Sequence, residues 1–240
     1  MSAAPRGYRS AGRTDVGKLR GHNEDALLIR DDLGLWVVAD GLGGHAAGDV
    51  ASALIVERLA ALSRTGTVHD FIEAIEDALI RTNDDLRQAA LERRVDLIGS
   101  TVALLVHHDA FMLCGWVGDS RVYAFEGNRL RQVTRDHAQG GVDDTDYGRR
   151  RPVPAGNAVL TRAIGAEERL AVDWLITGHR PGMQFLLCSD GVNKELADAE
   201  LEAAFRSPAS PPELIEHIVE TSLARGARDN VTAIVVRLGS

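Results

Sequence analysis

The chain has few cysteines and no long apolar run, and both features narrow its class. Its 240 residues include only two cysteines, Cys114 and Cys188, too few for a disulfide-stabilised scaffold. Both lie in apolar runs typical of buried strands, so we expect free thiols and a cytoplasmic protein. No stretch approaches the roughly 18 consecutive apolar residues of a membrane helix. The N-terminus has arginines but lacks the apolar core of a secretory signal. We therefore expect no membrane partner.

An excess of basic residues is also absent. The 27 Lys and Arg residues are outnumbered by 35 Asp and Glu residues, which gives a formal net charge of −8. Binding to a polyanion needs a clustered basic surface, so we expect no nucleic-acid partner.

The signatures of several common enzyme classes are missing too. The sequence contains no G-x-S-x-G elbow, no P-loop and no H-E-x-x-H pair. Residues 41–46 match the dinucleotide pattern G-x-G-x-x-A only loosely. An aspartate at position 40 would oppose a pyrophosphate, and the helix that follows leads to another helix, not to a parallel strand. These observations disfavour serine hydrolases, P-loop nucleotidases, zinc hydrolases and dinucleotide-binding enzymes.

The hydrophobic pattern predicts one α+β domain over residues 1–240. No repeat, linker or low-complexity tract divides the chain. Apolar residues recur at helical spacing from Val50 to Leu62, from Asp70 to Leu86 with Asp70 as its capping residue, and between Ser210 and Gly226, and a shorter helix is expected from Ala197 to Phe205. Strands are expected at Gly34–Ala39, Ser100–His107, Phe111–Val117, Arg121–Glu126, Arg129–Thr134, Val172–Thr177, Gln184–Ser189 and Val231–Arg237. The strands between Ser100 and Thr134 predict an antiparallel meander. The glycines, prolines and charged residues of 138–158 predict a long irregular loop, typical of a functional or mobile segment.

Acidic residues recur at the ends of the predicted strands. Each one alone is an ordinary turn signal, but acids gathered in space repel one another unless a cation neutralises them. Oxygen ligands without a His/Cys set favour Mg²⁺ or Mn²⁺ over zinc. The carboxylates in question are Glu24, Asp25, Asp40, Asp119, Asp190 and Asp229.

Eight motifs follow one another over most of the chain. The motifs are T-D-V-G-x-x-R-x-x-N-E-D (Thr14 to Asp25), V-V-A-D-G-L-G-G-H-A-A-G (Val37 to Gly48), G-S-T (Gly99 to Thr101), V-G-D-S-R-V-Y (Val117 to Tyr123), V-T-R-D-H (Val133 to His137), L-T-R-A-I-G (Leu160 to Gly165), L-L-C-S-D-G-V (Leu186 to Val192) and D-N-V-T (Asp229 to Thr232). In this order they resemble a bacterial metal-dependent serine/threonine protein phosphatase of the 2C type, and the resemblance is specific because it spans most of the chain.

The resemblance implies a four-layer α-β-β-α sandwich, with two central antiparallel sheets and a binuclear Mn²⁺ or Mg²⁺ centre. The resemblance also implies that Asp40 bridges the two metals with the Gly41 carbonyl as a further ligand, and that Asp190 and Asp229 bind the first metal. It implies that Glu24, supported by Asp25, holds the water shell of the second metal, and that Asp119 and Asp190 form a weaker third site. Finally, it implies that Asn230 supports Asp229 and that Arg20 binds the substrate phosphate.

The reaction implied is attack on phosphorus by a water that the two metals activate, with Arg20 stabilising the phosphoryl oxygens. Where many relatives have a histidine after Asp-Gly, this chain has Leu42, and His45 is the nearest candidate for the general acid. His137 is expected to be structural. The loop at 138–158 matches the family's flap, and its Arg149, Arg150 and Arg151 suggest recognition of an acidic or doubly phosphorylated substrate.

We expect, from this resemblance, a monomeric phosphatase acting on phosphoserine and phosphothreonine, and opposing a bacterial serine/threonine kinase that shares its target. Short members of this kind resemble phosphatases of type VI secretion control. Two alternatives stay open: a non-catalytic phosphopeptide-binding module on the same fold, and a small-molecule phosphoesterase with the same metal centre.

Overall fold

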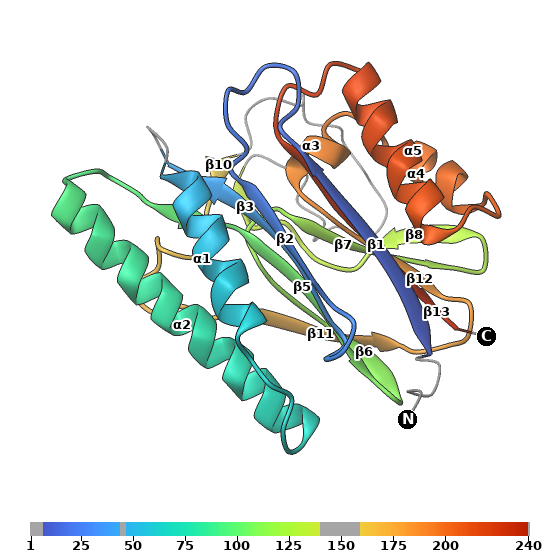
Figure 1. The fold of residues 1–240 in the computed structure, drawn as a ribbon, viewed down its shortest axis with the longest axis horizontal. Helices are drawn as coiled ribbons and strands as arrows, with labels where there is room; N and C mark the ends of the chain where they lie inside the picture. Colours follow the sequence, from blue (N-terminus) through green and yellow to red (C-terminus); the bar gives the residue numbers. More distant parts are fainter. Residues whose placement is uncertain (1–6, 44–46, 140–158, 240) are drawn as a thin grey trace.

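Two antiparallel sheets form the centre of the computed structural model, which describes residues 7–43, 47–139 and 159–239 (Figure 1). The first sheet has the order β1 (Tyr8–Asp15), β13 (Val231–Leu238), β12 (Gln184–Cys188), β7 (Arg121–Glu126) and β8 (Arg129–Gln132). The second has the order β11 (Asp173–Gly178), β6 (Phe111–Val117), β5 (Val102–His108), β3 (Leu35–Leu42) and β2 (Asp25–Arg30), with β4 (Gly99–Ser100) paired to β3. A separate two-stranded ladder joins β9 (Ala138–Gln139) and β10 (Val159–Leu160).

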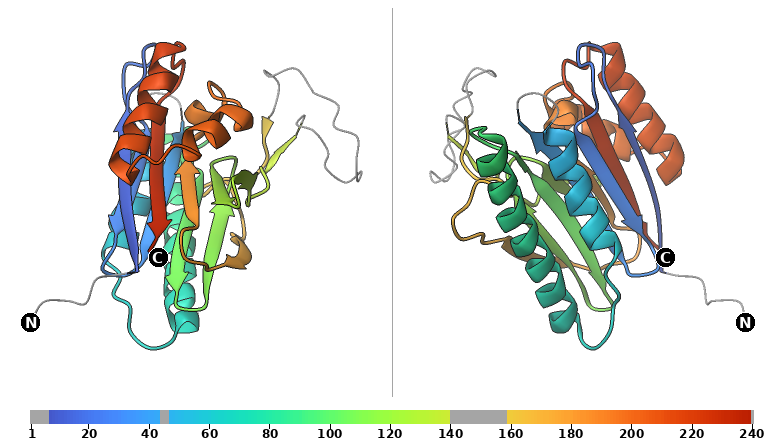
Figure 2. Two further views of the ribbon diagram at one scale, coloured as in Figure 1. Left: turned by 90° about the vertical axis from the view of Figure 1, so that its right-hand side faces the viewer. Right: turned by 60° about the vertical axis from the view of Figure 1, so that its left-hand side comes forward.

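Helices cover the outer face of each sheet, which confirms the expected four-layer sandwich (Figure 2). The second sheet carries α1 (Gly48–Ala60) and α2 (Val68–Arg93), and the first carries α4 (Asp198–Phe205) and α5 (Pro211–Ala224). A single short turn of helix, α3 (Asp190–Asn193), follows β12. No helix within the described ranges has both the length and the apolar character that crossing a bilayer would take.

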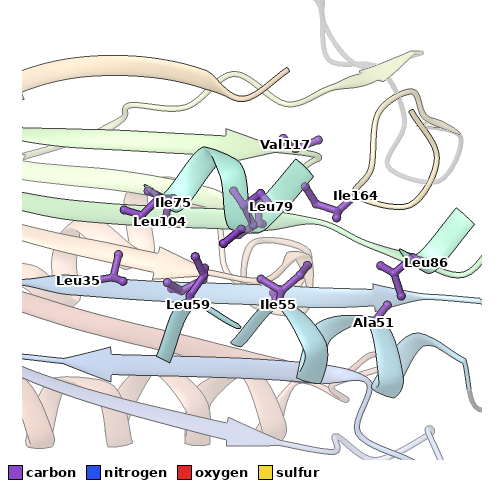
Figure 3. Close-up of a cluster of buried hydrophobic side chains, with 14 of the residues drawn as sticks. Leu35, Ala51, Ile55, Leu59, Ile75, Leu79, Leu86, Leu104, Val117 and Ile164 are labelled. Atoms are coloured by element: carbon purple, nitrogen blue, oxygen red, sulfur yellow. The ribbon is translucent and has the colours of Figure 1, made fainter. Parts of the chain in front are cut away.

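The central strands are apolar at successive positions because both of their faces are covered. In β3, Leu35 and Val37 face the helices α1 and α2, whereas Trp36 and Val38 face the other sheet. The same alternation holds in β12, where Leu186 packs under α4 and α5. A strand that is half exposed would alternate apolar and polar residues instead. Figure 3 shows the packing of α1 and α2 on the second sheet.

Helix α2 is longer than its apolar stripe indicates, and it begins before the predicted start at Asp70. Thr67 is the N-cap, and its hydroxyl accepts a hydrogen bond from the backbone N–H of Asp70 while the Asp70 carboxylate accepts one from the backbone N–H of Thr67. The prediction that Asp70 itself caps the helix is therefore wrong; it occupies the third helical position of a capping box. In α5, Ser210 is the N-cap and forms a capping box with Glu213, whose carboxylate accepts a hydrogen bond from the backbone N–H of Ser210.

The predicted meander between Ser100 and Thr134 is wrong at its middle connection. The pairs β5–β6 and β7–β8 form as expected, but β6 belongs to the second sheet and β7 to the first. The turn between them, at Gly118 to Ser120, therefore crosses from one sheet to the other. Hydrophobic alternation cannot distinguish this crossing from a hairpin, since both connect two buried strands. Strands β1 and β2 were also not predicted as elements.

Candidate functional site

A cavity of about 610 Å³ lies where strands of both sheets end. The strands β3, β6 and β12 run into it at their C-terminal ends, and β13 leaves it at its N-terminal end. In an antiparallel sheet, one strand begins at the edge where its neighbour ends. The acids at these strand ends therefore lie close together. The walls of the cavity are formed by Arg20, Glu24, Asp40, Gly41, Leu42, Gly43, Asp119, Leu160, Asp190, Gly191, Lys194, Glu195, Arg228, Asp229 and Asn230.

Asp40 is held at the end of β3 by the neighbouring Gly99–Thr101 segment. The Asp40 carbonyl accepts hydrogen bonds from the backbone N–H of Thr101 at 2.8 Å and from Ser100 Oγ at 3.0 Å. The Asp40 N–H donates to Thr101 Oγ1 at 3.2 Å. Thr101 Oγ1 also lies 2.7 Å from Ser120 Oγ, the residue after Asp119. The G-S-T motif therefore fixes the backbone of one pocket carboxylate and links it to the turn that carries another.

The glycines after Asp40 and Asp190 are required by close backbone approach. A Cβ on Gly41 would lie 2.1 Å from the Gly48 carbonyl oxygen, and a Cβ on Gly191 would lie 1.9 Å from the Asn230 carbonyl oxygen. Real Cβ atoms do not approach so closely. Both Asp-Gly pairs are thus packing requirements of the site and not ordinary turns.

The carboxylates of Asp190 and Asp229 are each held by a basic side chain. Asp190 Oδ2 forms an ion pair with Lys194 Nζ, one helical turn away. Its other oxygen, Oδ1, is buried and has no hydrogen-bond partner in the described part of the chain. Asp229 Oδ2 accepts a hydrogen bond from Arg20 Nη2 at 2.9 Å. A buried carboxylate oxygen without a partner is an unsatisfied acceptor that a cation would complete.

Asn230 anchors the loop that carries Arg20 and Glu24. Its Oδ1 accepts a hydrogen bond from the backbone N–H of Glu24, and its Nδ2 donates to the carbonyls of Val16 and His22. The expected hydrogen bond from Asn230 to Asp229 comes from the backbone, because the Asn230 N–H donates to Asp229 Oδ1 at 3.0 Å while the side chain holds the loop. The sequence contained no signal for this role, because the loop is more than 200 positions away.

Mutual repulsion and burial raise the pKa values of the pocket acids. Burial, and then the negative charges of Asp25, Asp190, Asp119 and Asp229, hold the pKa of Asp40 well above its ordinary range. Burial, and then Asp190, raise the pKa of Asp119 to about 6. Burial also raises the pKa of Asp190, although Lys194 opposes this shift. Positive charge supplied from outside would relieve this repulsion.

Asp25 lies behind the pocket and does not line it. It is 8% exposed and stands opposite Asp40 in the β2–β3 ladder. Ser189 Oγ donates a hydrogen bond to its Oδ2 at 2.7 Å. Burial raises the pKa of Asp25 to about 7, and hydrogen bonds from Thr232 and Ser189 oppose the shift. Asp25 is thus placed to support its neighbours rather than to contact a ligand in the cavity.

The donor set of the pocket fits a hard divalent cation. It offers carboxylate oxygens, the unpartnered Asp190 Oδ1 and acids whose charges repel one another. Among the residues whose positions are described, no three Asp, Glu, His or Cys side chains are already gathered as a finished ligand set. Lys194 and Arg20 hold the two acids that would have to turn toward the ion. The fit therefore rests on the chemistry of the donors.

The remaining predicted residues are placed as follows. His137 Nδ1 accepts a hydrogen bond from the backbone N–H of Gly118 at 3.1 Å, and its own N–H donates to the Gly118 carbonyl at 2.9 Å, so its structural role at the turn before Asp119 is evident. Cys114 and Cys188 are buried free thiols, as expected. His45 and the arginines at 149–151 lie outside the described residues.

The chain belongs to the protein phosphatase 2C family, whose family model matches residues 20–229. It is accordingly a metal-dependent phosphoprotein phosphatase. It is 31% identical to the serine/threonine phosphatase stp of Listeria welshimeri in an alignment of 239 positions that covers 93% of each chain.

Two solved structures extend the similarity to the fold. One is PppA, a key regulatory component of T6SS in Pseudomonas aeruginosa, with a TM-score of 0.87 and 40% identity over 96% of this chain and 97% of PppA. The other is the catalytic domain of PstP, the Mycobacterium tuberculosis phosphatase, in complex with two manganese ions. Its TM-score is 0.83, with 27% identity over 97% of this chain and 99% of that domain.

Proposed function

We propose that this chain hydrolyses phosphoserine and phosphothreonine in proteins with two divalent cations, Mn²⁺ or Mg²⁺, held in the carboxylate pocket. The observation that carries the proposal is the convergence of four aspartates from both sheets on one cavity: Asp40, Asp119, Asp190 and Asp229. The relatives' names, and the two manganese ions bound to PstP, support the same substrate class and metal.

The proposed metal ligands divide by the strand end that carries them. Asp40 would serve both ions with help from the Gly41 carbonyl, and Asp190 and Asp229 would bind the first ion. Glu24 would hold the second ion through water, and buried Asp25 would support Glu24 from behind the pocket. Asp119 and Asp190 are proposed for a weaker third ion. Asp119 lines the same cavity, and its raised pKa has the electrostatic cause expected of an acid beside Asp190.

The bound cations would activate a water for attack on phosphorus and neutralise phosphoryl charge. The chain's own residues orient the substrate around them. Arg20 is 48% exposed at the cavity wall and uses Nη2 to bind Asp229. Its other guanidinium nitrogens make no hydrogen bond to any described residue, so they are free to bind the phosphate. A planar guanidinium suits two phosphoryl oxygens at once.

A proton must also reach the departing seryl or threonyl oxygen. No histidine is among the described residues that line the cavity. We propose His45 as the general acid because it follows Asp40 closely in the chain, and this assignment stays a prediction.

Phosphate release from a phosphothreonine peptide, measured as Mn²⁺ is titrated, tests the proposal. Asp190→Asn should abolish Mn²⁺-dependent turnover. Asp198→Asn is a matched control, because Asp198 also begins a helix but lies outside the cavity. Metal-independent turnover would contradict the proposal, and intact peptide binding without any turnover would favour a regulatory module. Faster turnover of small phosphate monoesters than of peptides would favour the small-molecule phosphoesterase.

We also propose that the chain opposes a serine/threonine kinase in control of type VI secretion. The 40% identity to PppA supports this narrower assignment. The two buried free thiols are consistent with a reducing cytoplasm, and we propose a monomer with one catalytic domain over 1–240. Intact-mass measurement of the autophosphorylated kinase, before and after incubation with the chain, tests the pairing. A kinase that keeps all its phosphates would contradict it.

A further inference from the structure

The cavity wall contains two basic side chains that the proposed reaction does not use. Lys194 and Arg228 line it together with Arg20. Their side chains are 53% and 71% exposed, so both reach solvent at the cavity. The chain as a whole has a formal net charge of −8. The charge of these two accessible side chains is therefore opposite in sign to the net charge of the chain.

The guanidinium of Arg228 is held at its Nε atom, and its two terminal nitrogens are available to bind a ligand. Its Nε lies 3.1 Å from Oε1 of Glu195, whose side chain is only 8% exposed. Its terminal nitrogens make no hydrogen bond to a residue of the described ranges. A guanidinium whose Nε is held in this way presents a planar pair of donors, which suits a carboxylate or a phosphate.

Lys194 belongs to the same short segment. It follows α3, forms the ion pair with Asp190, and immediately precedes Glu195. An ammonium group has three N–H donors, and the Asp190 carboxylate is the only acceptor found for it among the described residues. Six residues, 190–195, thus carry a proposed metal ligand, the half-exposed cation paired with it and the side chain that holds Arg228.

We infer that Arg228 and Lys194 recognise a second negative group on the substrate, a carboxylate or a phosphate close to the phosphoresidue that is hydrolysed. The inference rests on the proposed function and specifies its substrate class as acidic or multiply phosphorylated segments. A cavity of about 610 Å³ is in the range that encloses a drug-sized ligand, so a phosphoresidue leaves room for a neighbouring side chain. These residues are distinct from the arginines at 149–151.

Two phosphothreonine peptides that differ only in flanking glutamates or flanking glutamines provide the test. The measured quantity is the ratio of kcat/KM for the acidic peptide to that for the neutral one. The unchanged chain should prefer the acidic peptide by about threefold, the effect expected of partly exposed ion pairs. Arg228→Gln and Lys194→Gln should each lower the ratio, and the double variant should bring it to about one. Raising the salt concentration should lower it as well.

Arg180→Gln is the matched control. Arg180 is also 71% exposed and also paired with a glutamate, Glu126, but it precedes β12 and so lies at the opposite end of that strand from Asp190. The Arg180→Gln variant should prefer the acidic peptide over the neutral one as strongly as the unchanged chain does. An equal ratio in the unchanged chain and the double variant, or an equal loss on both peptides, overturns the inference. Absence of Mn²⁺-dependent turnover on either peptide would overturn the proposed function instead.

Discussion

Asn230 Oδ1 accepts a hydrogen bond from the backbone N–H of Glu24 at 2.9 Å, although 206 positions separate the two residues. The Asn230 amide also donates to the carbonyls of Val16 at 2.8 Å and His22 at 2.9 Å. One side chain, 4% exposed, therefore fixes the N-terminal loop that presents Arg20 beside the last aspartate of the pocket.

Asn230→Ala should lower both stability and activity. The substitution leaves one backbone N–H and two carbonyls without a partner, which should cost about 3 kcal/mol of unfolding free energy. Because the loop carries Arg20, kcat/KM for a phosphopeptide should also fall, by about tenfold or more. Urea unfolding and steady-state kinetics measure the two effects.

Asn83→Ala is the control that separates the effect of Asn230→Ala on activity from its effect on stability. Asn83 is also fully buried and also bridges distant backbone, with Gly165 N–H donating to its Oδ1 and its Nδ2 donating to the Glu167 carbonyl, both at 2.9 Å. It does not line the cavity. It should lose similar stability while keeping KM at temperatures where the chain is folded. An equal rise of KM in both variants would mean that the Asn230 effect is general destabilisation.

Gly41→Ala and Gly191→Ala should be strongly destabilising for steric reasons. The added methyl group would meet a backbone oxygen at 2.1 Å and 1.9 Å, respectively, and backbone cannot move aside cheaply. We expect a loss of about 3 kcal/mol or more for each. Gly178→Ala is the control, because the nearest atom to its Cβ is 3.9 Å away. Thermal denaturation compares them, and equal Tm values for Gly41→Ala and Gly178→Ala would refute the close approach.

Much of the site was predictable from sequence because its acids occupy strand ends. Asp40, Asp119, Asp190 and Asp229 each adjoin or terminate an apolar run, and antiparallel pairing brings such ends to one edge. The resemblance supplied the four-layer sandwich, which periodicity alone did not reveal. The continuous apolar runs of β3 and β12 are consistent with cover on both faces, as the two core clusters on either side of them show.

What could not be predicted depends on contacts between distant residues. The anchor of Asn230, the cation Lys194 beside Asp190 and the crossing from β6 to β7 leave no periodic pattern in the sequence. The cap of α2 at Thr67 was a local feature, but Asp70, three positions later, is itself a favoured N-cap residue. Local rules thus identified the elements, whereas long-range hydrogen bonds define how the site is held.

Arg20→Lys should weaken binding of phosphate more than binding of metal. Lysine keeps a positive charge near Asp229 but loses the planar fork for two phosphoryl oxygens. We expect the inhibition constant of inorganic phosphate and KM to rise about tenfold, with Mn²⁺ affinity changed far less. Calorimetric titration of Mn²⁺ is the second readout. A large loss of Mn²⁺ affinity with unchanged phosphate inhibition would mean that Arg20 serves only to orient Asp229.

Replacement of Arg149, Arg150 and Arg151 by alanine should raise KM selectively for phosphoprotein. The three consecutive arginines supply donors for an acidic or doubly phosphorylated substrate. Hydrolysis of a small phosphate monoester should be unchanged, because such a substrate carries no second negative group for the arginines to bind. Unaltered kinetic constants on every substrate would exclude this role of the flap.

The metal-free chain should lose stability as the pH rises. The pKa of Asp119 is raised from 3.8 to about 6, and that of Asp25 to about 7, so the folded chain holds these protons more tightly than the unfolded chain. Their contribution is fully present below pH 4, the unfolded value, and is lost progressively as the pH rises through 6 and 7. For Asp119 alone the loss should be about 3 kcal/mol, at about 1.4 kcal/mol for each pKa unit. This loss of stability is checked by measuring Tm in EDTA at a series of pH values from acidic to neutral.

Mn²⁺ should reverse this trend, because the ion and the protons compete for the same carboxylates. At neutral pH, Mn²⁺ should raise Tm, with an effect that grows with the concentration of free metal, whereas near pH 4 it should have little effect. Asp119→Asn removes one of the repelling charges, so its metal-free form should be more stable than the unchanged chain at neutral pH and should show a shallower pH dependence. Asp84→Asn, an exposed position on α2 outside the cavity, controls for the change of net charge. A metal-free Tm that is flat or rises between pH 5 and 7 would show that burial and mutual repulsion do not raise the pKa values of these acids in the folded chain.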